Sequence, residues 1–304
     1  MDVAAVAVGL LGEGSRALAL ACWCPVKPGW ASRWPIAATR SPAARSPLNT
    51  LQMAATGERY VRSEEELLYA IGEIAARFDA ILFGDVALLT AGGGKIVLAD
   101  AFTLSAKVVI PPKCVLLTIE ALPGAMLLPS VADQGVVFEV QAPSVTFRNV
   151  WAYASTKNGE ISYFNTFIEA IDSGESYLGA GLNPRTIRAI DCVALCDRLF
   201  VDSSAGTADN AYLSGCTVNA PNATHDACVV FASKHCAVVD CSLDDGGGDT
   251  VTIDAGAEYC RVNGSDLDGG DVTSTASDGS NVIMGNLRTG TLTLHTTDAR
   301  GLNT

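Results

Sequence analysis

The side chains best suited to chemistry are aspartates grouped in two glycine-rich turns. One turn reads Leu243-Asp-Asp-Gly-Gly-Gly-Asp249 and the other reads Leu267-Asp-Gly-Gly-Asp271. Two carboxyl groups roughly 5–9.5 Å apart can cleave a glycoside, one as acid and the other as base or nucleophile. Carboxylate oxygens are also the ligands that Ca²⁺ prefers. Solvated turns are a third interpretation, because Asp and Gly favour turn conformations.

Four aspartates of these turns are candidate catalytic residues. A 24-residue offset aligns Asp244 with Asp268, and a two-residue gap then aligns Asp249 with Asp271. Stacked carboxylates repel one another unless water, a proton or a cation intervenes. With Asp245 added, the same residues form the candidate calcium site. A polysaccharide lyase would also need a base beside a metal-bound acidic cluster, and no recognisable motif supplies one.

The elements that would position these turns follow from a repeat in the second half of the chain. Its aligned positions are Cys192, Cys216, Cys241, Ser265 and Asn286, which lie 24, 25, 24 and 21 residues apart. Short β-branched stretches alternate with turns of Gly, Asp, Asn and Ser, and no helical pattern intervenes. A period of this length indicates a stacked array of units. The sequence therefore predicts an all-β fold, a single-stranded parallel β-helix with one rung per repeat.

The aligned cysteines are expected to form a column inside this β-helix. Equivalent positions in neighbouring rungs stack about 4.8 Å apart. Buried free Cys behaves as a small hydrophobic residue, so reduced structural thiols are favoured, as in a protein that folds in a reducing cytosol. A bridge between neighbouring rungs is also compatible with that distance.

The residues before the β-helix contain one clear helix signal, over 63–79. Ser63 and Glu66 form a capping box, in which each side chain pairs with a backbone amide of the other end of the motif. Leu67, Ile71 and Ile74 then fall on one apolar face. An uncovered first rung would expose unpaired strand edges, so this helix is expected to plug the N-terminal mouth.

Three regions follow from these patterns. Residues 1–52 hold three of the four tryptophans and five prolines, and are interpreted as an irregular or disordered leader or as a docking arm. Residues 53–80 contain the capping helix. Residues 81–304 form the parallel β-helix.

The opening strands carry a resemblance to a known family. A glycine-rich turn precedes strands expected at Ile96–Leu98, 102–104, 108–110, 115–117, 126–128 and 136–138, with Pro123-Gly124 closing a turn. This order resembles the first rungs of the pectate-lyase-like right-handed β-helix superfamily, which includes phage tailspikes and related virion proteins. The chain has Ala99-Asp-Ala-Phe102 where the family usually has a Pro-Xaa-Gly turn, so the resemblance implies the fold more than an activity.

A group of aromatic residues interrupts the regular rungs between 151 and 185. The candidate contact residues are Trp151, Tyr153, Tyr163 and Tyr177. Aromatic faces can stack on sugar rings, and Tyr and Trp are also enriched at subunit interfaces. The group therefore indicates either a glycan platform or an interface.

Charge limits the partners. The chain has a net charge of −13, although residues 1–52 carry five basic and two acidic side chains, so the remainder holds −16. Such a body repels phosphate backbones, and nucleic-acid binding is not expected. The apolar run 3–11 is too short to span a membrane. No cofactor is expected, unless the aspartates of the acidic turns bind Ca²⁺.

The resemblance implies a structural virion protein of a tailed bacteriophage: a spike, fibre or capsid-decoration subunit. Such a protein would fold in the host cytoplasm, assemble as a homotrimer with other virion proteins, and contact a host surface glycan. The alternative is a polysaccharide hydrolase or lyase that uses the aspartates of the late turns.

Overall fold

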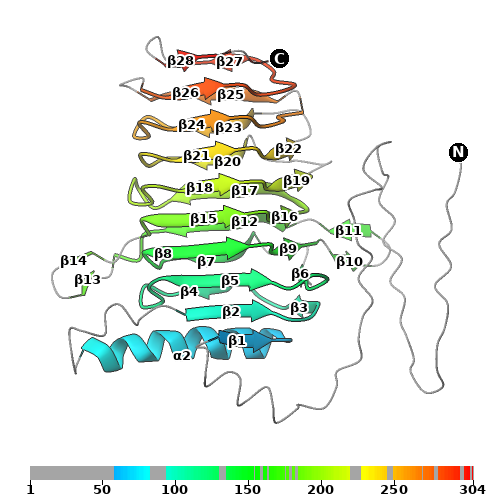
Figure 1. The fold of residues 1–304 in the computed structure, drawn as a ribbon, viewed down its shortest axis with the longest axis vertical. Helices are drawn as coiled ribbons and strands as arrows, with labels where there is room; N and C mark the ends of the chain where they lie inside the picture. Colours follow the sequence, from blue (N-terminus) through cyan, green and yellow to red (C-terminus); the bar gives the residue numbers. More distant parts are fainter. Residues whose placement is uncertain are drawn as a thin grey trace, which may run out of the picture.

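The chain winds into a parallel β-helix with a helix across its first rung (Figure 1), which confirms the predicted fold class. The computed structural model describes residues 58–82, 94–129, 135–153, 155–157, 160–162, 164–174, 176–177, 180–181, 184–219, 227–244, 249–268, 270–276, 280–294, 298–301 and 303. Within these residues, no helix has the length and apolar character needed to cross a membrane.

Three parallel sheets form the walls of the β-helix. The ten-stranded sheet contains β1 (Glu58–Val61), β2 (Gly94–Leu98), β5 (Leu117–Ala121), β8 (Ser144–Arg148), β15 (Thr186–Ile190), β18 (Tyr212–Ser214), β21 (Ala237–Val239), β24 (Arg261–Asn263), β26 (Val282–Met284) and β28 (Ala299–Arg300). The eight-stranded sheet contains β4 (Val108–Ile110), β7 (Val136–Val140), β12 (Phe164–Ile171), β17 (Cys196–Ser203), β20 (Ala227–Phe231), β23 (Asp249–Ile253), β25 (Asp271–Ser274) and β27 (Leu292–Thr293).

The third wall is shorter than the other two. This six-stranded sheet contains β3 (Phe102–Leu104), β6 (Leu127–Pro129), β9 (Trp151–Ala152), β16 (Val193–Ala194), β19 (Thr217–Asn219) and β22 (Ser242–Asp244). Two antiparallel hairpins leave the stack: β10 (Ser155–Lys157) with β11 (Glu160–Ser162), and β13 (Ser176–Tyr177) with β14 (Ala180–Gly181).

The strand register reproduces the sequence repeat. In the ten-stranded sheet, Arg188 pairs with Tyr212, Tyr212 with Ala237, Ala237 with Arg261, and Arg261 with Val282. These steps are the 24, 25, 24 and 21 residues of the repeat. The predicted stacking of rungs, and with it the column of cysteines, is therefore confirmed.

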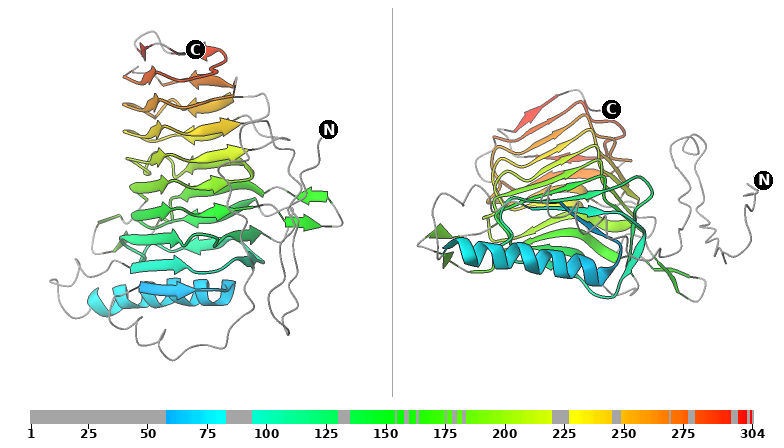
Figure 2. Two further views of the ribbon diagram at one scale, coloured as in Figure 1. Left: turned by 45° about the vertical axis from the view of Figure 1, so that its right-hand side comes forward. Right: turned by 60° about the horizontal axis from the view of Figure 1, so that its bottom comes forward.

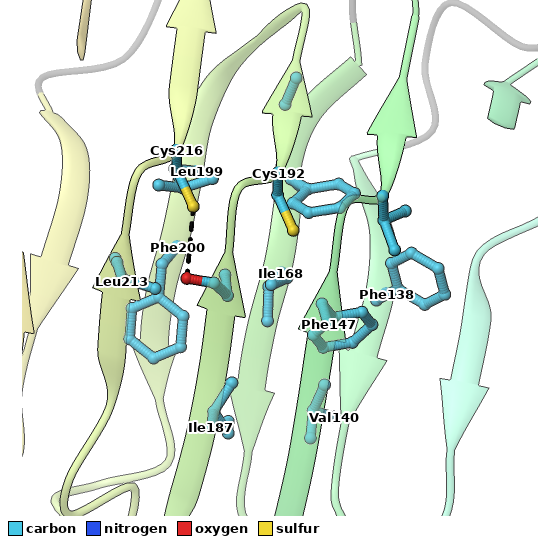
Figure 3. Packing of buried hydrophobic residues seen from close by; sticks show 14 of the residues in the cluster. Phe138, Val140, Phe147, Ile168, Ile187, Cys192, Leu199, Phe200, Leu213 and Cys216 are labelled. Atoms are coloured by element: carbon cyan, nitrogen blue, oxygen red, sulfur yellow. Dashed lines mark hydrogen bonds between the residues drawn. The ribbon is translucent and has the colours of Figure 1, made fainter. Parts of the chain in front are cut away.

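Phenylalanine fills the interior of the first and middle rungs. Phe138, Phe147 and Phe167 are fully buried, with Phe138 centred 4.8 Å from Phe147 and 5.7 Å from Phe167. Phe200 and Phe231 form a second pair at 5.9 Å. Figure 3 shows the rings of Phe138, Phe147 and Phe200 near Cys192 and Cys216, whose thiols point into the same core. The eight described cysteines are all buried and none forms a disulfide.

Helix α2 (Glu64–Leu82) lies across the end of the stack, as predicted (Figure 2). The Glu66 amide donates to Ser63 Oγ at 3.2 Å, and the Glu66 carboxylate accepts from the Arg62 amide at 2.9 Å. Leu67 and Ile74 are buried against the first rung. The helix is thus capped at its N-terminus and covers the strand edges there.

A second carboxylate of the first helical turn joins the helix to the β-helix. Glu64 accepts hydrogen bonds from the amides of Ser105 and Ala106 at 2.8 and 3.1 Å, and from the Ser105 hydroxyl at 2.7 Å. These residues form the turn between β3 and β4. The contact fixes the helix relative to the first complete rung.

Two strands at this end differ from those predicted. Strand β1 lies within the segment assigned to the cap, and pairs in parallel with β2 as the first strand of the ten-stranded sheet. Strand β5 begins at Leu117 rather than at Val115, because Leu116 adopts a left-handed backbone conformation with φ of 57°. The assignment of residues 1–52 lies outside the described residues.

Candidate functional site

The predicted alignment of Asp249 with Asp271 is present in the structure. The two residues are partners in the parallel register of β23 and β25. Asp271 Oδ1 accepts a hydrogen bond from the Thr291 amide at 2.5 Å. Asp271 therefore already has a backbone donor in the next rung, which is a structural role typical of stacked turns.

Asp268 is held by an arginine from the following rung. Arg288 donates from Nε to Asp266 Oδ1 at 2.7 Å and from Nη2 to Asp266 Oδ2 at 2.5 Å, and also binds Asp268 through Nη1. The Asp266 carboxylate raises the pKa of Arg288 above its ordinary value. Since Ser242 bridges to Asp266, Asp244 lies one rung from Asp268, as the 24-residue offset predicted.

The described residues provide no cluster of metal ligands that would support the calcium interpretation. Among them, no three His, Cys, Asp or Glu side chains come together closely enough to hold a metal ion. Asp245 lies outside the described residues. A calcium site in these turns therefore stays a prediction.

Trp151, one of the predicted aromatic contacts, lies on the same wall as Asp244 but several rungs away. Trp151, in β9 of the six-stranded sheet, has its ring 6.2 Å from that of Tyr153, and both side chains are half-buried. Strand β9 is three strands from β22, which carries Asp244, or about 14 Å at the usual strand spacing. Tyr163 lies outside the described residues, and the Tyr177 side chain in β13 is not described.

A notch on the outer face of the ten-stranded sheet was not predicted from the sequence. Its floor is Ala237 of β21, whose partners in the neighbouring strands are Tyr212 and Arg261. The larger side chains of these neighbours rise on either side of the alanine. With His235, Cys236 and Tyr259 they border an open depression with a volume of about 370 Å³. We refer to these six residues as the notch.

Two aromatic rings stack in parallel beside this floor. The His235 and Tyr259 rings are 5.2 Å apart with an interplanar angle of 10°. The two residues occupy equivalent turns in successive rungs, and both have φ of 59°. The same left-handed conformation recurs in other turns of the β-helix, as at Asn210, Asp191 and Asp240, so it is a property of the rung turns.

The backbone of the turns explains why the rings align. The Asn210 amide donates to the Lys234 carbonyl at 3.0 Å, and the His235 amide donates to the Glu258 carbonyl at 2.8 Å. Each left-handed residue is thereby fixed over its equivalent in the next rung. The Lys234 ammonium and the Glu258 carboxylate form an ion pair at 2.7 Å along the same turns.

Positive charge flanks the aromatic side chains. Arg188 is the register partner of Tyr212 on the side away from Ala237, and Arg261 lies on the other side of the floor. Both arginines are exposed. Guanidinium groups donate several hydrogen bonds to carboxylate or hydroxyl oxygens. The notch can therefore stack a ring and bind its oxygen substituents.

A signal for the notch is present in the sequence but is easily overlooked. His235 and Tyr259 lie 24 residues apart, each directly before a cysteine that precedes a rung strand. The repeat would have placed them in one column. Histidine is enriched in the left-handed backbone conformation, but tyrosine is not, so the residue types alone do not predict that both rings turn to the surface.

Comparison with known proteins gives only weak structural similarity. No family model and no curated protein matches the chain. The crystal structure of a Parabacteroides merdae protein, provisionally described as a glycosyl hydrolase, matches with a TM-score of 0.29 and 9% sequence identity. The match covers 80% of this chain and 92% of that one. At this similarity it transfers neither fold nor activity.

Proposed function

We propose that the protein is a non-enzymatic β-helix that binds a glycan at the notch. The observation that carries this proposal is the parallel stack of His235 on Tyr259 beside the small Ala237 floor. Sugar rings present apolar faces that pack on aromatic side chains. The depression is open to solvent, and its volume lies at the lower end of the range for small-ligand pockets, which suits one or two sugar units.

Arginine supplies the polar part of the recognition. The Arg261 guanidinium borders the floor and can donate to ring hydroxyls or to a sugar carboxylate. Arg188 extends the same column beyond Tyr212. Because the chain as a whole carries −13, this local positive charge is a feature of the notch rather than of the general surface.

The contacts of the acidic turns support binding without cleavage. A glycosidase needs one carboxyl group free to protonate the leaving oxygen and a second to act as base or nucleophile. Asp268 is bound by Arg288, and Asp271 accepts from the Thr291 amide. The described residues that line the notch include no carboxylate.

Glycan binding can be tested with variants of the notch and a control tyrosine variant outside it. Tyr259→Ala removes the outer ring of the stack, and Arg261→Ala removes the donor. Tyr259→Ala should weaken binding to the best ligand from a glycan array by about two- to tenfold, since aromatic contacts contribute about 0.5–1.5 kcal/mol. Arg261→Ala should weaken it by a similar factor, since a hydrogen bond contributes about 0.5–1.5 kcal/mol. Tyr69→Ala is the control, because this tyrosine is 68% exposed on α2, at the other end of the molecule. Unchanged affinity in Tyr259→Ala and Arg261→Ala would refute the notch as the site.

The alternative is a polysaccharide hydrolase or lyase, and the register of Asp249 with Asp271 is the observation that favours it. Cell-wall and capsular polysaccharides should be incubated with the wild type and with Asp249→Asn and Asp271→Asn. Release of reducing or unsaturated ends that both variants abolish would replace the binding proposal with an enzymatic one.

The biological setting is proposed from the sequence resemblance. In this proposal the protein is a virion subunit of a tailed bacteriophage, folded in the host cytoplasm, trimeric, and in contact with a host surface glycan. Immunogold labelling of purified particles tests the location, and light scattering tests the trimer. Unlabelled particles, or a stable monomer at micromolar concentration, would contradict this part of the proposal without affecting glycan binding.

A further inference from the structure

Cys236 and Cys260 are neighbours in two successive rungs beneath the notch. Each cysteine comes directly before one of the register partners Ala237 and Arg261, and the Arg261 amide donates to the Cys236 carbonyl at 2.9 Å. The Cα atoms of such neighbours are about 4.8 Å apart. This separation lies within the range of about 4.4–6.8 Å found across disulfides.

The two thiols also point to the same backbone oxygen. The Ser233 carbonyl accepts from Cys236 Sγ at 3.5 Å and from Cys260 Sγ at 3.4 Å. In the other column the Cys216 and Cys241 thiols also hydrogen-bond to each other, but they donate to different carbonyls, that of Ala189 at 3.3 Å and that of Leu213 at 3.6 Å. A shared acceptor brings the sulfur atoms of Cys236 and Cys260 toward each other.

We propose that Cys236 and Cys260 form a redox-active dithiol, which hydrogen peroxide converts to a disulfide that links the two rungs. One thiolate attacks a peroxide oxygen, giving a sulfenic acid and releasing hydroxide. The second thiol then attacks the sulfenic sulfur, forming the S–S bond and releasing water. Both sulfur atoms are oxidised by one electron each, and one peroxide is reduced to two waters.

Position and chemistry both favour this pair. Cys236 borders the notch, but both thiols are 0% exposed, so peroxide reaches them only when the turns around them open. A hydrogen bond from Cys236 lowers the pKa of Cys260 from its ordinary value, which favours the nucleophilic thiolate. Burial and the negative charge of the buried Asp202 act in the opposite direction, so the reaction should be slow compared with that of an exposed thiol.

This inference does not depend on glycan binding.

The next rung explains why the redox-active dithiol is confined to two residues. There the position equivalent to Cys260 is Asn281, whose side-chain oxygen accepts from the Cys260 amide at 2.8 Å. This column therefore contains two neighbouring thiols, followed by the side-chain amide of Asn281.

The test uses reduced protein treated with hydrogen peroxide, alkylated, and digested after Lys234, Glu258 and Arg261. The digestion separates 235–258 from 259–261. Recovery of these two peptides joined by a disulfide, with the loss of two titratable thiols, is expected. A folded, oxidised protein in which these peptides stay unlinked would overturn the proposal.

Matched variants identify the partner, because Cys241 shares a peptide with Cys236. Cys236→Ser and Cys260→Ser should each abolish the linked peptides, whereas Cys241→Ser should keep them. Persistence of the link in Cys236→Ser would assign it to Cys241 and refute the pair. If a serine variant fails to fold, linkage in Cys241→Ser alone decides, since Cys236 is then the remaining cysteine of its peptide.

Discussion

The middle and last rungs fill the same inward position with different side chains. In the middle rungs the position holds the thiols of Cys192, Cys216 and Cys241, whereas in the last rungs it holds Ser265, Asn286 and Asn303. Asn286 accepts from the Ser265 amide at 3.0 Å and donates to the Val262 carbonyl at 3.1 Å. The same exchange occurs in a second column, where Asn281 follows Cys260.

The exchange coincides with a change in what fills the core. The chain contains no phenylalanine after Phe231. In the middle rungs the large rings supply apolar volume, and a small thiol completes the packing. In the last rungs the side chains are smaller, and buried amides add hydrogen bonds to the backbone. Apolar volume thus stabilises the middle rungs, and hydrogen bonds from buried amides stabilise the last rungs.

The largest expected effect comes from removing volume in the middle rungs. Phe147→Ala should lower the free energy of unfolding by about 3–5 kcal/mol, because the ring contacts both Phe138 and Phe167 and leaves a cavity. Urea denaturation measures the loss. Phe147→Leu is the control and should cost roughly 1 kcal/mol. Equal losses in the two variants would show that ring volume is not what stabilises this region.

Removing an amide from the last rungs should have the next largest effect. Asn286→Ala leaves the Ser265 amide and the Val262 carbonyl without these partners, and an unsatisfied buried polar group costs about 1–3 kcal/mol. Hydrogen exchange should show faster opening of β24 and β26 than of β12 and β17. Cys241→Ala, at the equivalent position, should cost roughly 1 kcal/mol. A larger loss in Cys241→Ala would reverse the comparison.

Alkaline pH should destabilise the regions that contain thiols. Burial raises the pKa of Cys114 from 9.0 to about 12, and a hydrogen bond with Cys192 raises that of Cys216. The folded state then keeps protons that the unfolded chain releases. Stability is full below the unfolded pKa and falls above it, by about 1.4 kcal/mol per pH unit per thiol.

Urea denaturation at about pH 8 and at about pH 10 measures this slope, because the two pH values lie on either side of the ordinary pKa of a thiol. Cys114→Ala should make the slope shallower, because this group no longer contributes. An unchanged slope would mean that the Cys114 thiol titrates alike in the folded and unfolded states.

The smallest effect is expected at the surface of the last rungs. Arg288 is half exposed, so Arg288→Gln should lower stability by about 1 kcal/mol or less, as is typical of exposed ion pairs. The loss should diminish in high salt. A much larger loss would indicate that Asp266 and Asp268 repel strongly once the arginine is removed, and would make the acidic turns a better cation site.

The periodic part of the fold could be predicted from the sequence. Offsets between Cys192, Cys216 and Cys241 gave the register, because each rung must return to the same column. The capping box at Ser63 gave the helix. Strand β1 was missed because four residues, Glu58–Val61, carry no period of their own.

The candidate site was harder to predict. The alignment of Asp249 with Asp271 followed from the repeat, but the contact of Arg288 with Asp268 depends on a long side chain that reaches across rungs. The notch depends on left-handed φ at His235 and Tyr259, and of these two residue types only histidine is enriched in that conformation. Side-chain direction at such turns is set by the stack, and no local pattern encodes it.

The hydrogen bonds of Glu64 have a consequence for how the protein forms. By holding the turn at Ser105 and Ala106, the helix can give the first coil a fixed shape, and we propose that this coil forms before the later ones. Each new strand can then copy the alignment of the one beneath it, so an error at the start would be inherited by every later coil. The capping helix would thus serve as a template as well as a cover.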